Sequence, residues 1–456
     1  MPPPVPPLLQ LRSTDEYAAP AHSAPQLSAL GWLNDRATRN AKRIELSLPQ
    51  YLSSPAGTAG TLLAINQGSG KDYYEVSSES AEDPKHARRA FAGPGAVFDV
   101  QTHYIADHRR DLKGAKGVLG FIRHVAPERF EGLQEPLDLS LAEFLRCVFI
   151  ESETRVAVLT SAPGAESYNI LSNAEIAGTR ELTERFAGSP RLLHHSIVHP
   201  NEPGELERMA QMVERYRPIG FKVYTLYGSK KAPPWMLDDE RCGIPFLENA
   251  QRLGVKIICC HKGLSGLAPT GSPADVGPAA ARFPGLNFLV YHSGYEVPHG
   301  DVEEGPYTEE TAGVGTNRLL HSLIATGIAP NSNVYAELGS TWYLLMRRPR
   351  EAAHVLGKLL RYVGADNVLW GTDSPWYGPT QPLIDAFRAF TIPEELQERH
   401  GYPALTDELK AKILGGNAAR VYGVNLDALA KEEDDLSWIR ASVLEAKERG
   451  VLPGSP

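Results

Sequence analysis

Polar side chains that could bind a metal ion occur in residues 96–104, an apolar run that reads as a buried strand. Side chains alternate between the two faces of a strand, so we expect Asp99, Gln101 and His103 to share one face. Three polar groups on one face of a buried strand are hard to explain as core packing alone. This segment therefore predicts one wall of a metal or catalytic site.

The same combination recurs further along the chain, where Lys222, His261, His292, Glu337 and Asp373 each lie at or near the end of a short apolar run. Converging imidazole and carboxylate groups bind a divalent transition ion and leave one coordination position open. Such an ion lowers the pKa of bound water and polarises a carbonyl group, and a nearby carboxylate can accept the proton of the water. These residue types predict a shared metal site, although a lone histidine at a strand end is more often a structural residue.

The elements that would position these residues alternate between short apolar runs and segments with helical spacing. The predicted strands are residues 96–104, 155–160, 192–198, 220–224, 255–261, 286–292, 334–338 and 368–373, and the predicted helices are residues 141–149, 173–186, 205–216, 239–253, 316–326 and 350–363. Alternating strands and helices indicate a parallel α/β fold, and eight strands favour a (β/α)8 TIM barrel over an open sheet. The carboxyl ends of all strands would then meet on one face.

Three regions are expected. Residues 1–92 are rich in Pro, Ser, Ala and Gly, and predict an N-terminal extension that wraps the barrel or a partner subunit. Within it, we expect residues 41–65 to lie on the surface. Residues 93–425 form the barrel, in which residues 104–138 are a long connection. Residues 426–456 are a helical tail that could contribute to a homodimer contact.

Composition excludes several classes of protein. The formal net charge of -9 argues against binding to nucleic acid through phosphates. There is no apolar window of about 18 residues, so we expect no membrane span. The segment around Lys42 and Arg43 departs strongly from an export leader. The four cysteines lack zinc-type spacing, which fits a reducing, cytoplasmic setting.

The motifs and their order resemble the amidohydrolase superfamily, specifically its amidohydrolase-related branch with aminocarboxymuconate-semialdehyde and resorcylate-type decarboxylases, lactonases and some hydratases. The resemblance extends from Gly93 to Val424. It is carried by Phe98-Asp-Val-Gln-Thr-His, Gly220-Phe-Lys-Val-Tyr, Cys260-His-Lys-Gly, Tyr291-His-Ser-Gly, Leu369-Trp-Gly-Thr-Asp-Ser-Pro and Lys412-Ile-Leu-Gly-Gly-Asn-Ala-Ala-Arg-Val-Tyr-Gly423.

The resemblance implies that His103, His261 and Asp373 bind one divalent ion, with zinc expected ahead of manganese. His292 would polarise the substrate carbonyl or orient the water, and Asp373 would also transfer the proton. Gln101 departs from the family pattern, which normally has histidine there and glutamate in some decarboxylases. A neutral amide is a weaker ligand. The ion is therefore held by three ligands with Gln101 as a weak fourth, or the site has changed or lost its metal.

Other residues have two readings each. Lys222 is a catalytic residue that neutralises a substrate carboxylate, or a carboxylated lysine that bridges two ions as in binuclear relatives. Glu337 supports a ligating histidine or forms a buried pair with Lys222. Arg109 meets an anionic substrate or lies in a solvated loop. Trp235 and Trp376 line the substrate pocket or serve as core packing.

Three functions remain open at this stage. The first is a metal-dependent hydrolase of a small carbonyl substrate: an amide, a lactone or a carbon–carbon bond beside a carbonyl. The second is a nonoxidative decarboxylase of an aromatic or unsaturated acid. The third is a barrel without metal that binds a ligand. The basic residues Lys222 and Arg109 suit a carboxylated small molecule in either enzyme.

Overall fold

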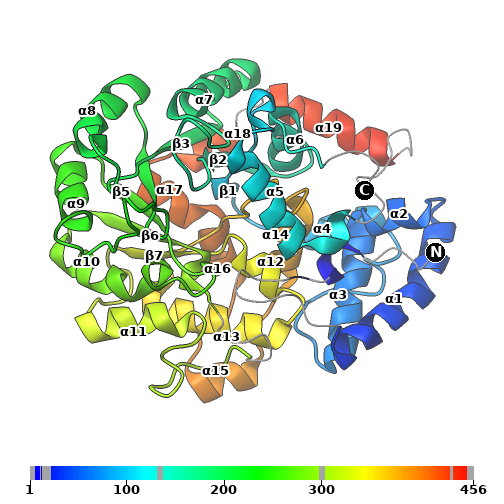
Figure 1. Ribbon diagram of the computed structural model, residues 1–456. Helices are drawn as coiled ribbons and strands as arrows, with labels where there is room; N and C mark the ends of the chain where they lie inside the picture. The colour runs from blue at the N-terminus through cyan, green and yellow to red at the C-terminus, as the bar shows by residue number, and fades with distance from the viewer. Residues whose placement is uncertain are drawn as a thin grey trace.

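Eight parallel strands form one sheet in chain order in the computed structural model, which describes residues 6–10, 12, 22–130, 137–296, 303–431 and 435–448. The predicted (β/α)8 barrel is confirmed, and every predicted strand is present (Figure 1). The strands are β1 (Val97–Thr102), β2 (Thr154–Leu159), β3 (Leu192–Ile197), β4 (Gly220–Tyr224), β5 (Ile257–His261), β6 (Asn287–Tyr291), β7 (Val334–Glu337) and β8 (Val368–Leu369).

The barrel closes between β8 and β1 through backbone hydrogen bonds that continue beyond the short strand β8. The amide of Val100 donates to the carbonyl of Trp370 at 3.0 Å, and the amide of Asp373 donates to the carbonyl of Gln101 at 2.9 Å. The amide of His103 donates to the carbonyl of Ser374 at 2.8 Å. The residues after β8 therefore run alongside the end of β1.

Side chains alternate between the inside of the barrel and the surrounding helices, as parallel strands require. The pairing of β1 with β2 shifts register between Asp99 and Thr102, which interrupts this alternation. Asp99 consequently accepts hydrogen bonds from Thr372, whereas Gln101 and His103 reach Asp373, so the three do not share one face as predicted. The interior is packed with Phe98, Val100, Val156, Val158, Ile257, Cys259, Leu289, Tyr291, Tyr335 and Leu369.

Helices cover the outside of the barrel (Figure 1). Helix α7 illustrates why they form where they do, since Ser172 and Glu175 make a capping box at its start and Gly188 ends it with a φ of 75°. The covering helices include α6 (Leu141–Leu145), α7 (Asn173–Ala187), α8 (Glu205–Tyr216), α9 (Gly243–Arg252), α10 (Val276–Arg282), α11 (Asn317–Thr326), α12 (Thr341–Leu345), α13 (Pro349–Leu359), α14 (Gln381–Ala389), α15 (Glu394–His400), α16 (Asp407–Ala411) and α17 (Asn417–Tyr422).

The N-terminal region forms helices that pack beside the barrel, and they are α1 (Ala24–Arg43), α2 (Leu48–Leu52), α3 (Pro55–Ser69) and α4 (Pro84–Phe91) (Figure 1). The expectation that residues 41–65 lie on the surface holds for residues 42–50, which are exposed or half-buried, but it is wrong for α3, which is buried on nearly all sides. A helix that is apolar all round lacks the periodicity of an amphipathic helix. The region is joined to the barrel by the amide of Glu75, which donates to the carbonyl of Ala389 at 2.7 Å.

Two further segments are helical. Residues 104–138, predicted as a loop, contain α5 (Lys113–Val125), whose apolar residues Ala115, Ile122 and Val125 are buried. Its three glycines and its charged residues concealed the helical pattern. The C-terminal tail forms α18 (Leu426–Lys431) and α19 (Asp435–Glu448), and Arg191 donates to the Ser437 hydroxyl at 2.6 Å. None of the helices in the described ranges is long and apolar enough to span a membrane.

Burial of α3 predicts that the N-terminal helices contribute to the stability of the whole chain. Leu62 is completely buried in α3, whereas Leu27 in α1 is 58% exposed. Leu62→Ala should lower the free energy of unfolding by about 2–5 kcal/mol, because it leaves a cavity. Leu27→Ala is the matched control and should change it by less than about 0.5 kcal/mol. Denaturant unfolding followed by circular dichroism measures both, and equal values for the two variants would contradict the packing.

Candidate functional site

Asp373 lies at the centre of the polar groups at the carboxyl end of the barrel. Its Oδ1 accepts a hydrogen bond from Gln101 Nε2 at 3.0 Å and lies 3.1 Å from His103 Nε2. Its Oδ2 accepts a hydrogen bond from the Ser340 hydroxyl at 2.6 Å. Burial alone would raise the pKa of Asp373, but the contacts with His103 and Ser340 lower it well below its usual range. The carboxylate is therefore ionised.

The second pair of groups is His261 and His292, whose Nδ1 and Nε2 atoms are 3.1 Å apart. His292 Nδ1 lies 2.8 Å from the carbonyl of Gly339, and His261 Nε2 lies 3.2 Å from the carbonyl of Leu264. A carbonyl only accepts, so both of these nitrogens carry a proton. Burial lowers the pKa of His292 to about 4 and that of His261 well below its usual value, so both rings are neutral at pH 7. The two nitrogens that face each other are consequently both unprotonated.

His103 follows the same rule, since its Nδ1 lies 3.0 Å from the carbonyl of Thr160 and must donate to it. The Nε2 atom that remains faces the Asp373 carboxylate. That contact is favourable only if the ring is protonated on both nitrogens or if a cation lies nearby. Trp376 stacks on the ring of His103, with centroids 5.3 Å apart and planes inclined by 10°. Trp376 therefore lies beside one of the predicted metal ligands, and its predicted contact with substrate stays a prediction.

Glu337 supports the turn that carries His292. Its Oε2 accepts a hydrogen bond from the amide of His292 at 3.0 Å, and its Oε1 accepts one from the amide of Gly339. Gly371 is required beside it, because a Cβ at that position would lie 1.7 Å from Glu337 Oε1. Burial raises the pKa of Glu337 to about 8 despite these hydrogen bonds.

Lys222 is fully buried, and its ammonium group lies 3.4 Å from the ring centroid of Tyr291 and 4.7 Å from that of Tyr224. Its Nζ makes no hydrogen bond with any residue that the structure describes. Burial lowers the pKa of Lys222 to about 8. The contacts do not include a direct pair between Lys222 and Glu337. Lys222 lies over the ring of Tyr291, and Glu337 accepts a hydrogen bond from the amide of His292.

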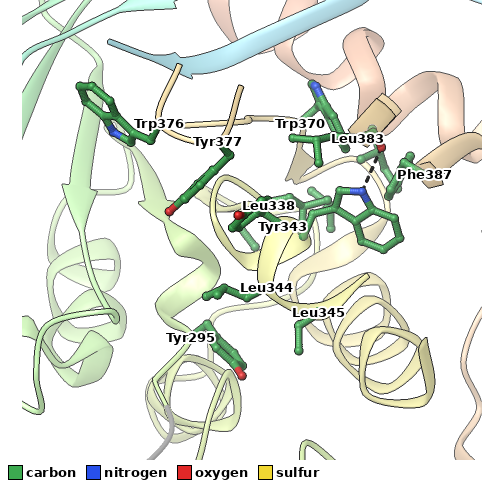
Figure 2. Close-up of a cluster of buried hydrophobic side chains, with 14 of the residues drawn as sticks. Tyr295, Leu338, Tyr343, Leu344, Leu345, Trp370, Trp376, Tyr377, Leu383 and Phe387 are labelled. Atoms are coloured by element: carbon green, nitrogen blue, oxygen red, sulfur yellow. Dashed lines mark hydrogen bonds between the residues drawn. The ribbon is translucent and has the colours of Figure 1, made fainter. Parts of the chain in front are cut away.

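An aromatic wall completes this end of the barrel. Tyr377 follows Trp376, and its hydroxyl lies 2.8 Å from the hydroxyl of Ser340. The rings of Tyr377 and Tyr343 stack with centroids 3.7 Å apart and planes inclined by 12°. Figure 2 shows Tyr343, from α12, next to Tyr377 within a larger group of buried aromatic and aliphatic side chains. Arg12 lies over the ring of Tyr343, 3.3 Å from its centroid, so this ring is enclosed by protein groups.

The donor atoms fit a divalent ion in type. His103 Nε2, His261 Nδ1 and the Asp373 carboxylate are of the ligand types that zinc and manganese accept. Gln101 Oε1 is buried and has no hydrogen-bond partner in the described part of the chain, so its lone pairs are available. In the described residues, no three His, Cys, Asp or Glu side chains are grouped closely enough to hold a metal ion. The groups stand as two pairs, His103 with Asp373 and His261 with His292.

Two residues predicted for substrate binding lie apart from these pairs. Arg109 forms an ion pair with Glu175, with Nε 2.7 Å from Oε2, and its Nη1 donates to the carbonyl of Glu166 at 2.9 Å. Trp235 packs edge-on against Phe246 of α9, with centroids 6.0 Å apart, and its amide donates to the carbonyl of Thr225 at 3.0 Å. Sequence reasoning missed Ser340. The one sequence feature that could have indicated a role for Ser340 is its position three residues after the end of β7.

The raised pKa of Glu337 predicts a dependence of stability on pH. Between its ordinary pKa of 4.5 and the folded value of about 8, the folded protein keeps a proton that the unfolded chain releases. The free energy of unfolding should therefore fall as pH rises through this window, by up to about 1.4 kcal/mol per pH unit. Glu337→Gln should make this slope shallower, and the exposed Glu309→Gln should not. Urea unfolding with chelator at pH 5, 6, 7 and 8 measures it, and identical slopes would refute it.

Comparisons with curated proteins, with solved structures and with family models gave the following results. A search of curated proteins returned no match. An uncharacterised TIM-barrel protein from Bordetella bronchiseptica is 17% identical, with a TM-score of 0.47 over 74% of this chain and 99% of its own. The 5-carboxyvanillate decarboxylase from Novosphingobium aromaticivorans, solved with manganese, is 15% identical, with a TM-score of 0.46 over 72% of this chain and 96% of its own.

The 2,6-dihydroxybenzoate decarboxylase from Rhizobium is 16% identical, with a TM-score of 0.42 over 72% of this chain and 99% of its own.

The comparison with family models shows the family of this chain, because the model of the amidohydrolase family matches residues 99–424. This match includes all eight strand ends and every residue of the two pairs. With its barrel and the residues at its carboxyl end in place, the chain belongs to the amidohydrolase family.

Proposed function

We propose that this protein is a metal-dependent hydrolase that acts on a small carbonyl substrate: an amide, a lactone or a carbon–carbon bond beside a carbonyl. The observation that carries the proposal is the contact between His261 and His292. Two neutral imidazoles direct unprotonated nitrogens at each other across 3.1 Å, which is unfavourable unless a cation accepts a lone pair. The ionised carboxylate of Asp373 provides the negative charge that such a cation needs.

The ion would be held by His103, His261 and Asp373, with the carbonyl oxygen of Gln101 as a weaker fourth ligand. We infer zinc ahead of manganese because imidazole is the main ligand type. When bound, the ion supplies a Lewis acid and makes water a nucleophile at neutral pH. Asp373 accepts the proton of the water and returns it to the leaving group. His292 orients the substrate carbonyl, and Glu337 keeps His292 in place through its amide.

A decarboxylase of an aromatic or unsaturated carboxylic acid is the second candidate. It is favoured by Trp376, an aromatic side chain beside His103 that suits a planar substrate. Both candidates predict a carboxylated substrate, because the buried ammonium of Lys222 lacks an anionic partner within the described residues. A homodimer and a cytoplasmic location stay predictions from the sequence.

Metal content tests the proposal directly. Wild-type protein purified without chelator should contain about one zinc or manganese ion per chain by elemental analysis. His261→Ala and Asp373→Ala should each lose most of this metal and all activity, because each removes a principal ligand. His321→Ala and Asp366→Ala are matched controls, since both residues lie on the exposed surface. Protein without metal that binds ligands equally well would instead indicate a binding barrel.

The reaction itself separates the two enzymatic candidates. A panel of lactones, amides and hydroxybenzoates that carry carboxyl groups is incubated with the enzyme in water labelled with oxygen-18. A hydrolase incorporates the label into its product, whereas a decarboxylase releases carbon dioxide and leaves the product unlabelled. We expect incorporation of the label. Carbon dioxide release without incorporation would establish the second candidate in place of the first.

A further inference from the structure

The loop that follows β5 determines how His261 is oriented. The carbonyl of Leu264 accepts the hydrogen bond from His261 Nε2 at 3.2 Å, and this contact leaves Nδ1 free to face His292. Leu264 and Leu267 have φ angles of 41° and 61°, in the left-handed region that disfavours leucine. Such a backbone persists only where surrounding contacts hold it in place.

Glu296 provides those contacts. Its side chain is fully buried, and its Oε1 accepts hydrogen bonds from the amide of Leu267 at 3.0 Å and from the Ser265 hydroxyl. Its Oε2 accepts a hydrogen bond from Arg318 of α11, which anchors the carboxylate from the other side. The neighbouring carbonyl of Tyr295 accepts a hydrogen bond from the amide of Leu264 at 2.9 Å. Glu296 thus binds the loop through both Ser265 and Leu267, although it does not contact His261 or His292.

We propose that Glu296 is a positioning residue for His261: it holds the Leu264 carbonyl in place and so keeps the His261 proton on Nε2 and the lone pair on Nδ1. Glu337 does the same for His292, through the amides of His292 and Gly339. Each of the two facing imidazoles therefore has its own buried glutamate. The consequence for catalysis rests on the proposed function, but the effect on the His261 tautomer does not.

The tautomer is measured directly by long-range proton–nitrogen spectra of protein labelled with nitrogen-15 histidine, with bound zinc and again in excess chelator. The His261 signals are assigned by their loss in His261→Ala. The zinc-bound wild type should show a single tautomer with the proton on Nε2, and this tautomer should still predominate in chelator because the Leu264 carbonyl accepts the proton. Glu296→Ala should give a mixture of both tautomers, because the Leu264 carbonyl is no longer fixed. Zinc affinity, from competition with a chromophoric chelator, should fall about 10–100-fold, as is typical when a partner behind a ligand is removed.

The control is Glu304→Ala. Glu304 is also a buried glutamate, bound to Lys358 and to the amide of Thr316, but it makes no contact with residues 263–268. This variant should lose stability and keep the wild-type His261 tautomer. Glu296→Gln should also keep it, since the amide oxygen still accepts from Leu267 and Ser265. If Glu296→Ala does not fold, Ser265→Ala is measured in its place and should also produce a mixture.

An unchanged His261 tautomer in the folded Glu296→Ala variant, or in Ser265→Ala where it replaces that variant, would overturn the proposal. So would an equal change in Glu304→Ala. A wild-type protein that binds no zinc would refute the proposed function alone, because the tautomer in chelator still tests the role of Glu296.

Discussion

The closure of the barrel between β8 and β1 is the constraint on which the site depends. Strand β8 is only two residues long, and the backbone that follows it pairs with the end of β1 through Gln101 and His103. This pairing fixes Asp373 opposite Gln101 and His103, although the three come from opposite ends of the barrel sequence. A register shift in β1 then turns both side chains toward the carboxylate. Without closure, His103 and Asp373 would not lie close together.

Backbone carbonyl groups determine the chemistry of the imidazoles. Each ring gives one proton to a carbonyl, and the acceptors are those of Thr160, Leu264 and Gly339. The remaining nitrogen of each ring is directed to the centre of the site as an acceptor. A core histidine would normally satisfy both nitrogens, whereas the facing nitrogens of His261 and His292 have no donor between them.

Backbone strain is concentrated in the same place. Non-glycine residues with positive φ are rare in folded proteins and cost about 1–3 kcal/mol each when surroundings impose them. Several lie in the segments that carry the site, which are the turns after β5, β6, β7 and β8. They are Leu264, Leu267, His292, Ser293, Ser340 and Asp373. Buried glutamates hold two of these turns, Glu296 at the first and Glu337 at the second, so carboxylates that never touch the substrate stabilise the geometry that would bind it.

The sequence by itself determined the barrel and most of the site. Short apolar runs that alternate with segments of helical spacing identify the fold, because parallel strands covered by helices are buried on both faces. Placing His103, His261, His292, Glu337 and Asp373 at one face follows from that topology alone. The same reasoning failed for α3, since a helix buried on all sides has no polar face to reveal its period.

Only the tertiary structure decided which of these residues touch one another. Gln101 binds Asp373, Arg109 is held by Glu175, and Trp235 packs against Phe246, none of which follows from strand position. The supporting roles of Ser340 and Glu296 were also invisible in the sequence. The physical reason is that a hydrogen bond depends on distances of a few tenths of an ångström and on angle, which loops and register shifts set and periodicity does not.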